Sequence, residues 1–419
     1  MNAVRHNVLV LGADYGLFMV ALTFASQSTI LPAFAASLGA PNVLIGAIPA
    51  VMTLGWFLPS LFAAGHTETL TRKLPFLLRW TAWERIPFLV LALLAFFTAE
   101  QWPNLTLALM LAMLLIITTV GGILMPAWMD LIARAMPATI RGRFFALSNF
   151  LAGLVGFAAS FLVARVLAWV PAPASYGVCF LGATLCVGLS WIALALVREE
   201  EAERAAPPVP LRHYLGRMPA LLRRDRNLSW FLISRGCSLT ASMASGFYTV
   251  YALRAWDAPA AQAGVFTAFM LVGQSIGTLT LGSVADHAGR RLVLLTGMTA
   301  AVGAITAALL APSLAAFGLV FFLYGIQAAA VNVSNLNVLL EFSPTPEARP
   351  TYIGLGTTAM APMAFGAPLI GGLLADALGF RAMFAVALAF ALAGLVMLAT
   401  LVRDPRHVVL GVAVEESGA

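Results

Sequence analysis

The chain has 419 residues, of which 61% are hydrophobic and only 10% are charged, and its net charge is +6. A soluble domain averages roughly 25% charged residues, so this composition excludes a soluble globule and predicts an integral membrane protein. The apolar runs do not alternate with polar residues, which predicts membrane-spanning helices rather than a closed barrel.

Twelve membrane-spanning helices are predicted from the long apolar runs, and short turns rich in Gly, Pro and Asn separate them. The first span is expected to be retained, because no cleavage site follows it. The predicted spans cover residues 8–37, 42–65, 76–98, 103–134, 143–170, 174–198, 228–253, 259–284, 291–312, 314–342, 351–375 and 380–402.

The longest polar interval lies in the middle of the chain and is predicted to be a linker. It begins with three glutamates at Glu199, contains the pair Pro207-Pro208 and ends in a run rich in arginine. The predicted organisation is an N-terminal six-helix bundle of residues 1–198, a cytoplasmic linker of residues 199–227, a C-terminal six-helix bundle of residues 228–402 and a cytoplasmic tail of residues 403–419.

The basic residues predict the orientation of the chain in the membrane. With the N-terminus placed inside, 19 of the 24 Lys and Arg residues fall in inside segments and only Arg254 and Arg381 fall in outside loops. Cytoplasmic segments carry such an excess of positive charge. We therefore expect cytoplasmic termini and a location in the cell inner membrane, and we do not read the net charge as a sign of nucleic-acid binding.

The two halves of the chain repeat one another. The segment Asn7–Gly16 aligns with Asn227–Gly236, and Arg141–Leu147 aligns with Arg349–Leu355. The matches keep their order along the chain at offsets of 208 to 220 residues. A parallel six-helix repeat predicts two pseudo-symmetric bundles, which is an architecture found in secondary transporters.

A charged turn between the eighth and ninth spans, Gly282–Arg291, has glycines, an acid and a basic pair at fixed spacing. An altered copy, Gly65–Lys73, lies between the second and third spans and has Thr69 in place of the acid. This turn resembles the signature loop of the major facilitator superfamily, and the stretch Phe365–Arg381 resembles that superfamily's junction between spans 11 and 12. The resemblance covers essentially the whole chain and implies an all-α transporter fold with alternating access.

Two further stretches refine the resemblance. The segment Arg72–Arg85 resembles a poorly characterised bacterial subgroup of the superfamily. The fifth span, around Ala152–Ser160, lacks the Gly-Pro signature of the superfamily's proton antiporters. That absence counts against export by antiport.

Charged residues near the inner ends of the spans are predicted to be structural. Asp130 and Arg134 have the i, i+4 spacing of a helical ion pair. Glu84 and Arg85, beside Arg79, are expected to form a charge cluster at the membrane interface. The predicted signature-loop and latch residues are Gly65, Arg72, Lys73, Asp130, Arg134, Arg141, Arg143, Gly282, Asp286, Gly289, Arg290, Arg291 and Arg349.

Ionisable residues inside spans are costly and are functional candidates by default. Asp14 lies about two turns into the first span and Arg235 about two turns into the seventh, and the resemblance implies that these spans line a central cavity. We expect the two side chains to pair when one side of the cavity closes, or Asp14 to titrate and couple transport to protons. The alternative is that Asp14 forms hydrogen bonds within its own bundle.

Polar residues near mid-span are predicted to line a substrate cavity, although serine also packs helices together in membranes. The low charge of this set disfavours phosphate esters, and Arg235 alone is available for a single carboxylate. The cavity candidates are Gln27, Ser28, Trp56, Thr118, Ser238, Ser242, Tyr248, Gln274, Tyr324, Gln327, Asn332 and Asn335.

No enzyme motif and no phosphate-binding loop is found in the sequence, so transport is predicted to be secondary. We expect proton-linked export of small amphipathic or lipophilic molecules by a monomer without a cofactor or a bound metal. The alternatives are uptake or facilitated diffusion of a neutral polar solute or a monocarboxylate, and a membrane sensor that does not transport.

Overall fold

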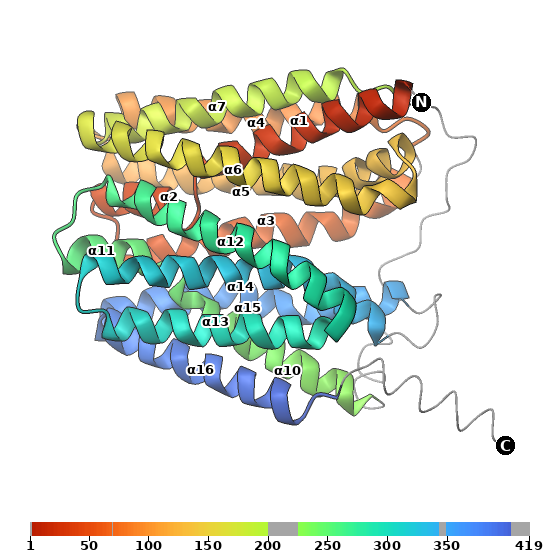
Figure 1. The fold of residues 1–419 in the computed structure, drawn as a ribbon. Coiled ribbons are helices and arrows are strands. Elements are labelled where there is room, and N and C mark those ends of the chain that lie inside the picture. The colour runs from red at the N-terminus through yellow and green to blue at the C-terminus, as the bar shows by residue number, and fades with distance from the viewer. Residues whose placement is uncertain (1, 69, 200–224, 343–348, 404–419) are drawn as a thin grey trace. The chain divides into compact units, whose positions relative to one another are not determined.

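A computed structural model describes residues 2–68, 70–199, 225–342 and 349–403 (Figure 1). These residues form helices, and no strand occurs among them. Residues 200–224 of the predicted linker and residues 404–419 of the predicted tail lie outside the described residues. The all-α prediction is confirmed.

The first half of the chain contains the helices of the first six predicted spans. They are α1 (Asn2–Phe24), α2 (Ile30–Ser37), α3 (Asn42–Glu68), α4 (Leu74–Phe97), α5 (Pro103–Ala135), α6 (Ala138–Trp169) and α7 (Ala174–Ala195). The second half contains α10 (Arg226–Ala241), a 3-10 turn (Ser242–Ala244), α11 (Tyr248–Ala255), α12 (Gln262–Ala288), α13 (Arg290–Leu310), α14 (Leu314–Glu341), α15 (Arg349–Leu378) and α16 (Phe380–Thr400).

Ten of the described helices are long and apolar enough to cross a membrane. The two remaining predicted spans are α3, whose apolar described part covers Asn42–Trp56, and the seventh span, which is divided between α10 and α11. Every predicted span thus corresponds to one helix or to two helices that follow each other in the chain. The arrangement is consistent with the predicted twelve-span fold.

The first and seventh spans are broken, which the sequence analysis did not predict. α1 ends at Phe24 and α2 begins at Ile30, while α10 is followed by the 3-10 turn before α11 begins. Hydroxyl groups at the second break bond to nearby carbonyls, with Ser242 Oγ donating to Leu239 O at 2.6 Å and Ser245 Oγ to Ser242 O at 2.8 Å. Such local bonds compete with the helical ladder. Ser238 therefore lies within α10, whereas Ser242 and Ser245 lie in the break.

The chain divides into two compact units. The N-terminal unit contains Met1–Val209 and Gly246–Leu271, and the C-terminal unit contains Pro210–Ser245 and Val272–Ala419. This division differs from the predicted domains by placing Gly246–Leu271 with the first half. Hydrogen bonds join that segment to the break between α1 and α2.

Two of these bonds are buried and well formed. Thr29 Oγ1 and Thr267 Oγ1 lie 2.6 Å apart, and Thr249 Oγ1 donates to Ser28 O at 2.8 Å. The break in the first span therefore leaves the carbonyl of Ser28 available to α11 and the hydroxyl of Thr29 available to the start of α12.

Each unit closes its first helix onto the end of its last helix through an asparagine. Asn7 Nδ2 donates to Arg198 O at 2.9 Å, and Arg198 N donates to Asn7 Oδ1 at 2.9 Å. In the C-terminal unit, Asn227 Nδ2 donates to Arg403 O at 3.0 Å, and Arg403 N donates to Asn227 Oδ1 at 2.8 Å. We call these two contacts the asparagine clasps, and they extend the repeat seen in the sequence to the three-dimensional structure.

Glycine allows α3 and α5 to approach closely in the N-terminal unit. A Cβ atom added at Gly122 would lie 2.7 Å from the carbonyl oxygens of both Gly55 and Trp56. Thr118 of α5 packs against Gly55 and is fully buried, and its hydroxyl donates to Leu114 O at 2.8 Å. Small residues permit such close helix packing in membranes. Thr118, a predicted cavity residue, is therefore a packing residue in this structure.

Candidate functional site

Asp14 of α1 is 4% exposed, and both of its carboxylate oxygens are bonded within the N-terminal unit. Ser190 Oγ donates to Oδ1 at 2.6 Å, and Arg85 Nη2 lies 3.4 Å from the same oxygen. Trp128 Nε1 donates to Oδ2 at 3.0 Å. The structure thus shows the alternative in which Asp14 bonds within its own bundle. Arg235 is 4% exposed on α10 of the C-terminal unit, and its pairing with Asp14 stays a prediction.

Arg85 of α4 joins Asp14 to a second acid, Glu84. Arg85 Nη1 lies 3.5 Å from Glu84 Oε2, Arg85 Nη2 donates to Ser190 Oγ at 2.9 Å, and Arg85 Nε donates to Val187 O at 2.9 Å. Glu84 Oε2 also accepts a hydrogen bond from Thr81 Oγ1 at 3.2 Å. The guanidinium of Arg85 therefore forms ion pairs with two carboxylates.

Glu84 and Arg85 form the expected charge pair inside the N-terminal unit, and their place at a membrane interface stays a prediction. Both residues are 6% exposed, whereas Trp80 is 46% exposed and Trp83 is 58% exposed. Thr81, Glu84 and Arg85 have the i, i+3, i+4 spacing of neighbouring positions on a helix surface, and all three are buried. Thr81, Glu84 and Arg85 consequently lie on the face of α4 that packs inside the unit.

We call this group the Asp14 cluster. Its members come from α1, α4, α5 and α7, and α7 packs against both α1 and α4 (Figure 1). It contains two carboxylic acids and one guanidinium among hydroxyl and indole donors. The members are Asp14, Thr81, Glu84, Arg85, Trp128 and Ser190.

An aromatic and amide surface adjoins the Asp14 cluster. The rings of Trp128 and Tyr15 stack with centroids 5.8 Å apart and an interplanar angle of 26°. Tyr15 Oη donates to Asn149 Oδ1 of α6 at 2.9 Å, and all three side chains are half-buried. The sequence analysis missed Tyr15 and Asn149, although the position of Tyr15 directly after Asp14 was an available signal.

The predicted cavity residues are distributed over both units and differ in exposure, so their common cavity stays a prediction. Ser28 bonds to its surroundings, with its Oγ 3.3 Å from Met270 Sδ. The side chain of Asn335 lies outside the described part of the chain. Gln27 and Asn332 are exposed, the half-buried residues are Trp56, Ser242, Gln274, Tyr324 and Gln327, and the buried residues are Ser28, Thr118, Ser238 and Tyr248.

The predicted ion pair of Asp130 and Arg134 is confirmed, with Arg134 Nη2 2.7 Å from Asp130 Oδ2. Lys73 is 1% exposed, and its Nζ lies 3.4 Å from the same oxygen. Arg134 Nη1 also donates to Thr71 O at 2.9 Å, and the guanidinium of Arg141 donates to Met136 O and Ala133 O. Arg72 and Arg143 are exposed. These bonds fasten the turn between α3 and α4 to the end of α5.

Glu199, predicted to begin the linker, caps α4. Its Oε1 accepts a hydrogen bond from Lys73 N at 2.6 Å and its Oε2 accepts one from Leu74 N at 2.8 Å. A carboxylate at a helix N-terminus satisfies free amide groups and opposes the positive end of the helix dipole. The segment that follows α7 is therefore part of the fold of the N-terminal unit.

The second signature turn fastens helices within the C-terminal unit. Gly289 has φ 94°, a left-handed conformation that favours glycine. Arg290 Nη1 lies 2.6 Å from Glu341 Oε1 of α14, and Arg291 Nη2 donates to Leu398 O at 3.1 Å on α16. Gly282 is half-buried on α12. The side chains of Asp286 and Arg349, and the surroundings of Gly65, lie outside the description, so a latch between the units stays a prediction.

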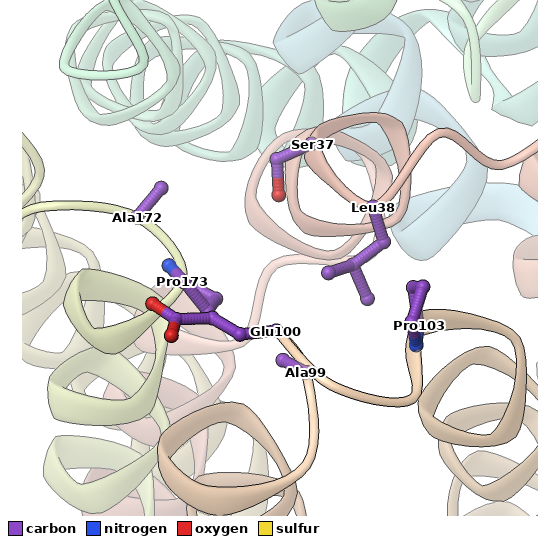
Figure 2. Close-up of a pocket in the computed structure, with 7 residues that line it drawn as sticks. All are labelled: Ser37, Leu38, Ala99, Glu100, Pro103, Ala172 and Pro173. Carbon is purple, nitrogen blue, oxygen red and sulfur yellow. The ribbon is translucent and has the colours of Figure 1, made fainter.

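A pocket in the N-terminal unit lies between three connecting turns, and none of the predicted site residues lines it (Figure 2). Its volume is about 280 Å³. The lining residues are Ser37, Leu38, Ala99, Glu100, Pro103, Ala172 and Pro173. Within the described residues, no group of three or more His, Cys, Asp or Glu side chains is placed to hold a metal ion.

Comparisons with known proteins agree with this fold. Residues 230–417 match the family model described as Major Facilitator Superfamily. A comparison with curated protein sequences finds no match. The predicted resemblance to the major facilitator superfamily is confirmed: residues 230–417 match the superfamily's family model, and nearly the whole chain shares its fold with solved transporters.

Solved structures of transporters resemble nearly the whole chain. A mutant of the nucleoside transporter NupG aligns with TM-score 0.72 and 12% identity, over 93% of this chain and 98% of that chain. The xylose transporter XylE from E. coli, in a partially occluded inward-open conformation, aligns with TM-score 0.68 and 12% identity, over 96% and 99%. A bacterial homologue of the iron transporter ferroportin aligns with TM-score 0.67 and 14% identity, over 93% and 98%. These comparisons show that the chain has a fold found in transporters.

Proposed function

We propose that this protein is a proton-coupled secondary transporter of the bacterial inner membrane, which exports small amphipathic molecules by alternating access. The observation that carries the proposal is the Asp14 cluster, in which Asp14, Glu84 and Arg85 are buried together inside a membrane-spanning unit. Buried ionisable groups of this kind mark proton relays and ion pathways. The orientation with cytoplasmic termini rests on the distribution of arginine, and the monomer rests on the resemblance.

Several observations support a coupling role. A single buried arginine between two acids can exchange partners when one acid is protonated, and this exchange changes which helices it joins. Asp14 contacts Trp128, which stacks on Tyr15 at a half-exposed surface. A molecule that displaces this ring pair would therefore alter a hydrogen bond to the carboxylate.

Flux measurements in liposomes containing the purified protein test the proposal. We expect lipophilic amphiphiles to be transported under an imposed pH gradient, and Asp14→Asn to reduce this transport to the level without a gradient while leaving exchange of substrate intact. The aligned change Ser234→Ala in the C-terminal unit is the matched control and should keep the response to the gradient. Equal wild-type flux with and without a gradient would refute coupling, and flux of no compound would favour the sensor.

A second candidate is uptake or facilitated diffusion of a neutral polar solute. The stacked rings of Tyr15 and Trp128 beside the amide of Asn149 favour it, because aromatic faces and amides suit a ring that carries hydroxyl groups. Transporters named for nucleosides and for xylose share the fold. Saturable flux of such solutes without a response to pH would select this candidate.

A further inference from the structure

We infer that Glu84 is the proton-binding carboxyl group of the Asp14 cluster and that Asp14 stays ionised. This inference rests on the proposed proton coupling and assigns it to one side chain. It starts from the charge of the cluster. With both acids ionised and Arg85 positive, the cluster would carry one uncompensated negative charge, which is costly at a buried site in a membrane. One bound proton removes that charge.

The hydrogen-bond donors favour an ionised Asp14. Donors from three side chains reach its two oxygens, namely the hydroxyl of Ser190 at 2.6 Å, the indole of Trp128 at 3.0 Å and the guanidinium of Arg85 at 3.4 Å. Donors that converge on a carboxylate stabilise its charged form. Asp14 therefore occupies the better site for a negative charge.

Glu84 has weaker support for a charge. Its Oε2 accepts two long contacts, from Thr81 Oγ1 at 3.2 Å and from Arg85 Nη1 at 3.5 Å. Among the described residues no donor reaches Oε1, which lies against Gly121, where an added Cβ atom would be 2.8 Å away. An oxygen without a donor suits a neutral carboxyl group better than a carboxylate.

The charged groups that face Glu84 are Arg85 of its own helix and Asp14 of α1. From the other helices packed here, α5 contributes Gly121 and α7 contributes Ser190 through Arg85. The Cβ position at Gly121 that lies 2.8 Å from Glu84 Oε1 also lies 2.9 Å from Trp56 Cη2. Trp56 is half-buried and is a predicted cavity residue, so the proposed proton site and a proposed substrate contact share a neighbour.

Infrared difference spectroscopy of the full-length protein in lipid nanodiscs tests the inference without a transport assay. We expect the wild type to show the C=O stretch of a protonated carboxyl group at neutral pH. We expect Glu84→Gln and Asp14→Asn each to abolish this band. In either variant the single remaining acid is ionised and balances the charge of Arg85, so the cluster no longer needs a bound proton. The control Glu100→Gln, which changes an exposed acid at the α4–α5 turn, should retain it.

Isotope labelling identifies the residue that holds the proton. If Glu84 holds it, carboxyl-¹³C glutamate shifts the band and labelled aspartate does not. A shift with aspartate, or a wild type without the band, would overturn the inference. Gradient-driven transport with an aspartate shift would leave the proposed function standing. A glutamate shift without gradient-driven transport would refute the coupling and keep the proton site.

Discussion

The two units pack their first and last helices against each other with different chemistry. In the N-terminal unit the contact between α1 and α7 contains Asp14, bonded to Ser190 and Arg85. The aligned position in the C-terminal unit is Ser234 of α10, whose Oγ donates to Gly394 O of α16 at 2.8 Å. Both contacts are buried, and the second forms without an ion pair at that position.

The two units share some fastening contacts, while the Asp14 cluster occurs in the N-terminal unit. Both units have an asparagine clasp and a basic turn that fastens neighbouring helices. At the position aligned with Asp14, a neutral hydroxyl and a glycine carbonyl join α10 to α16, so this position does not require a buried carboxylate. A buried ion pair is in any case weak evidence for stability. The charges of the Asp14 cluster therefore call for a functional explanation.

Among the variants that test this comparison, the removal of Arg85 should have the largest effect on stability. Arg85→Met leaves two buried acids without their cation and should lower the free energy of unfolding by about 3–5 kcal/mol. The double variant Arg85→Met with Asp14→Ser imitates the neutral contact of the C-terminal unit and should recover part of this loss, but not proton coupling. Thermal unfolding in detergent measures both. A double variant less stable than the single one would show that the charges are structural.

The two aligned hydroxyl groups should differ in their contribution to stability. Ser190→Ala removes a donor to a charged oxygen and should cost about 1.5–3 kcal/mol, while Ser234→Ala removes a neutral hydrogen bond and should cost about 0.5–1.5 kcal/mol. Denaturant titration of the two variants in the same detergent gives the difference. Equal costs would argue against an ionised Asp14.

Replacing a glycine at a close helix contact by alanine should destabilise the two units equally. Gly122→Ala would place a Cβ 2.7 Å from two carbonyl oxygens, and Gly297→Ala would place one 2.5 Å from the Cβ of Ala330. We expect each variant to lose about 1–3 kcal/mol by overpacking. Gly188→Ala, where no atom lies within 4 Å, is the control and should show no loss in a thermal unfolding assay.

The asparagine clasps should give the smallest effects. Asn7→Ala and Asn227→Ala each remove two hydrogen bonds to the backbone and should each cost about 0.5–1.5 kcal/mol. Asn7 is buried and Asn227 is half-buried, so the change in the N-terminal unit should be the larger. Hydrogen exchange at the ends of α7 and α16 measures local opening, and unchanged exchange would show that the clasps do not fasten these helices.

Much of the fold could be predicted from the sequence, because apolar runs and turn residues report directly on membrane spans. The break in the first span could not, because Ala25–Thr29 contains neither Gly nor Pro and the hydroxyl of Thr29 finds its partner, Thr267, on another helix. The break in the seventh span contains Gly246, but a single glycine inside an apolar run does not by itself predict a break. The Asp14 cluster was predicted in part. Asp14 stood out as an acid inside a span, but Arg85 lies among basic residues near a helix end, and only the packed helices show which face it occupies.

The asparagine clasps also bear on how the chain assembles during synthesis. Asn7 and Arg198 are 191 positions apart, and Asn227 and Arg403 are 176 apart. Neither clasp can form until the ribosome has produced the sixth helix of its own half. The first half can therefore acquire its clasp while the second half is still being translated, but it receives α11 and the start of α12 only later. At the break between α1 and α2, the carbonyl of Ser28 and the hydroxyl of Thr29 must wait for partners in a segment made more than 200 residues later.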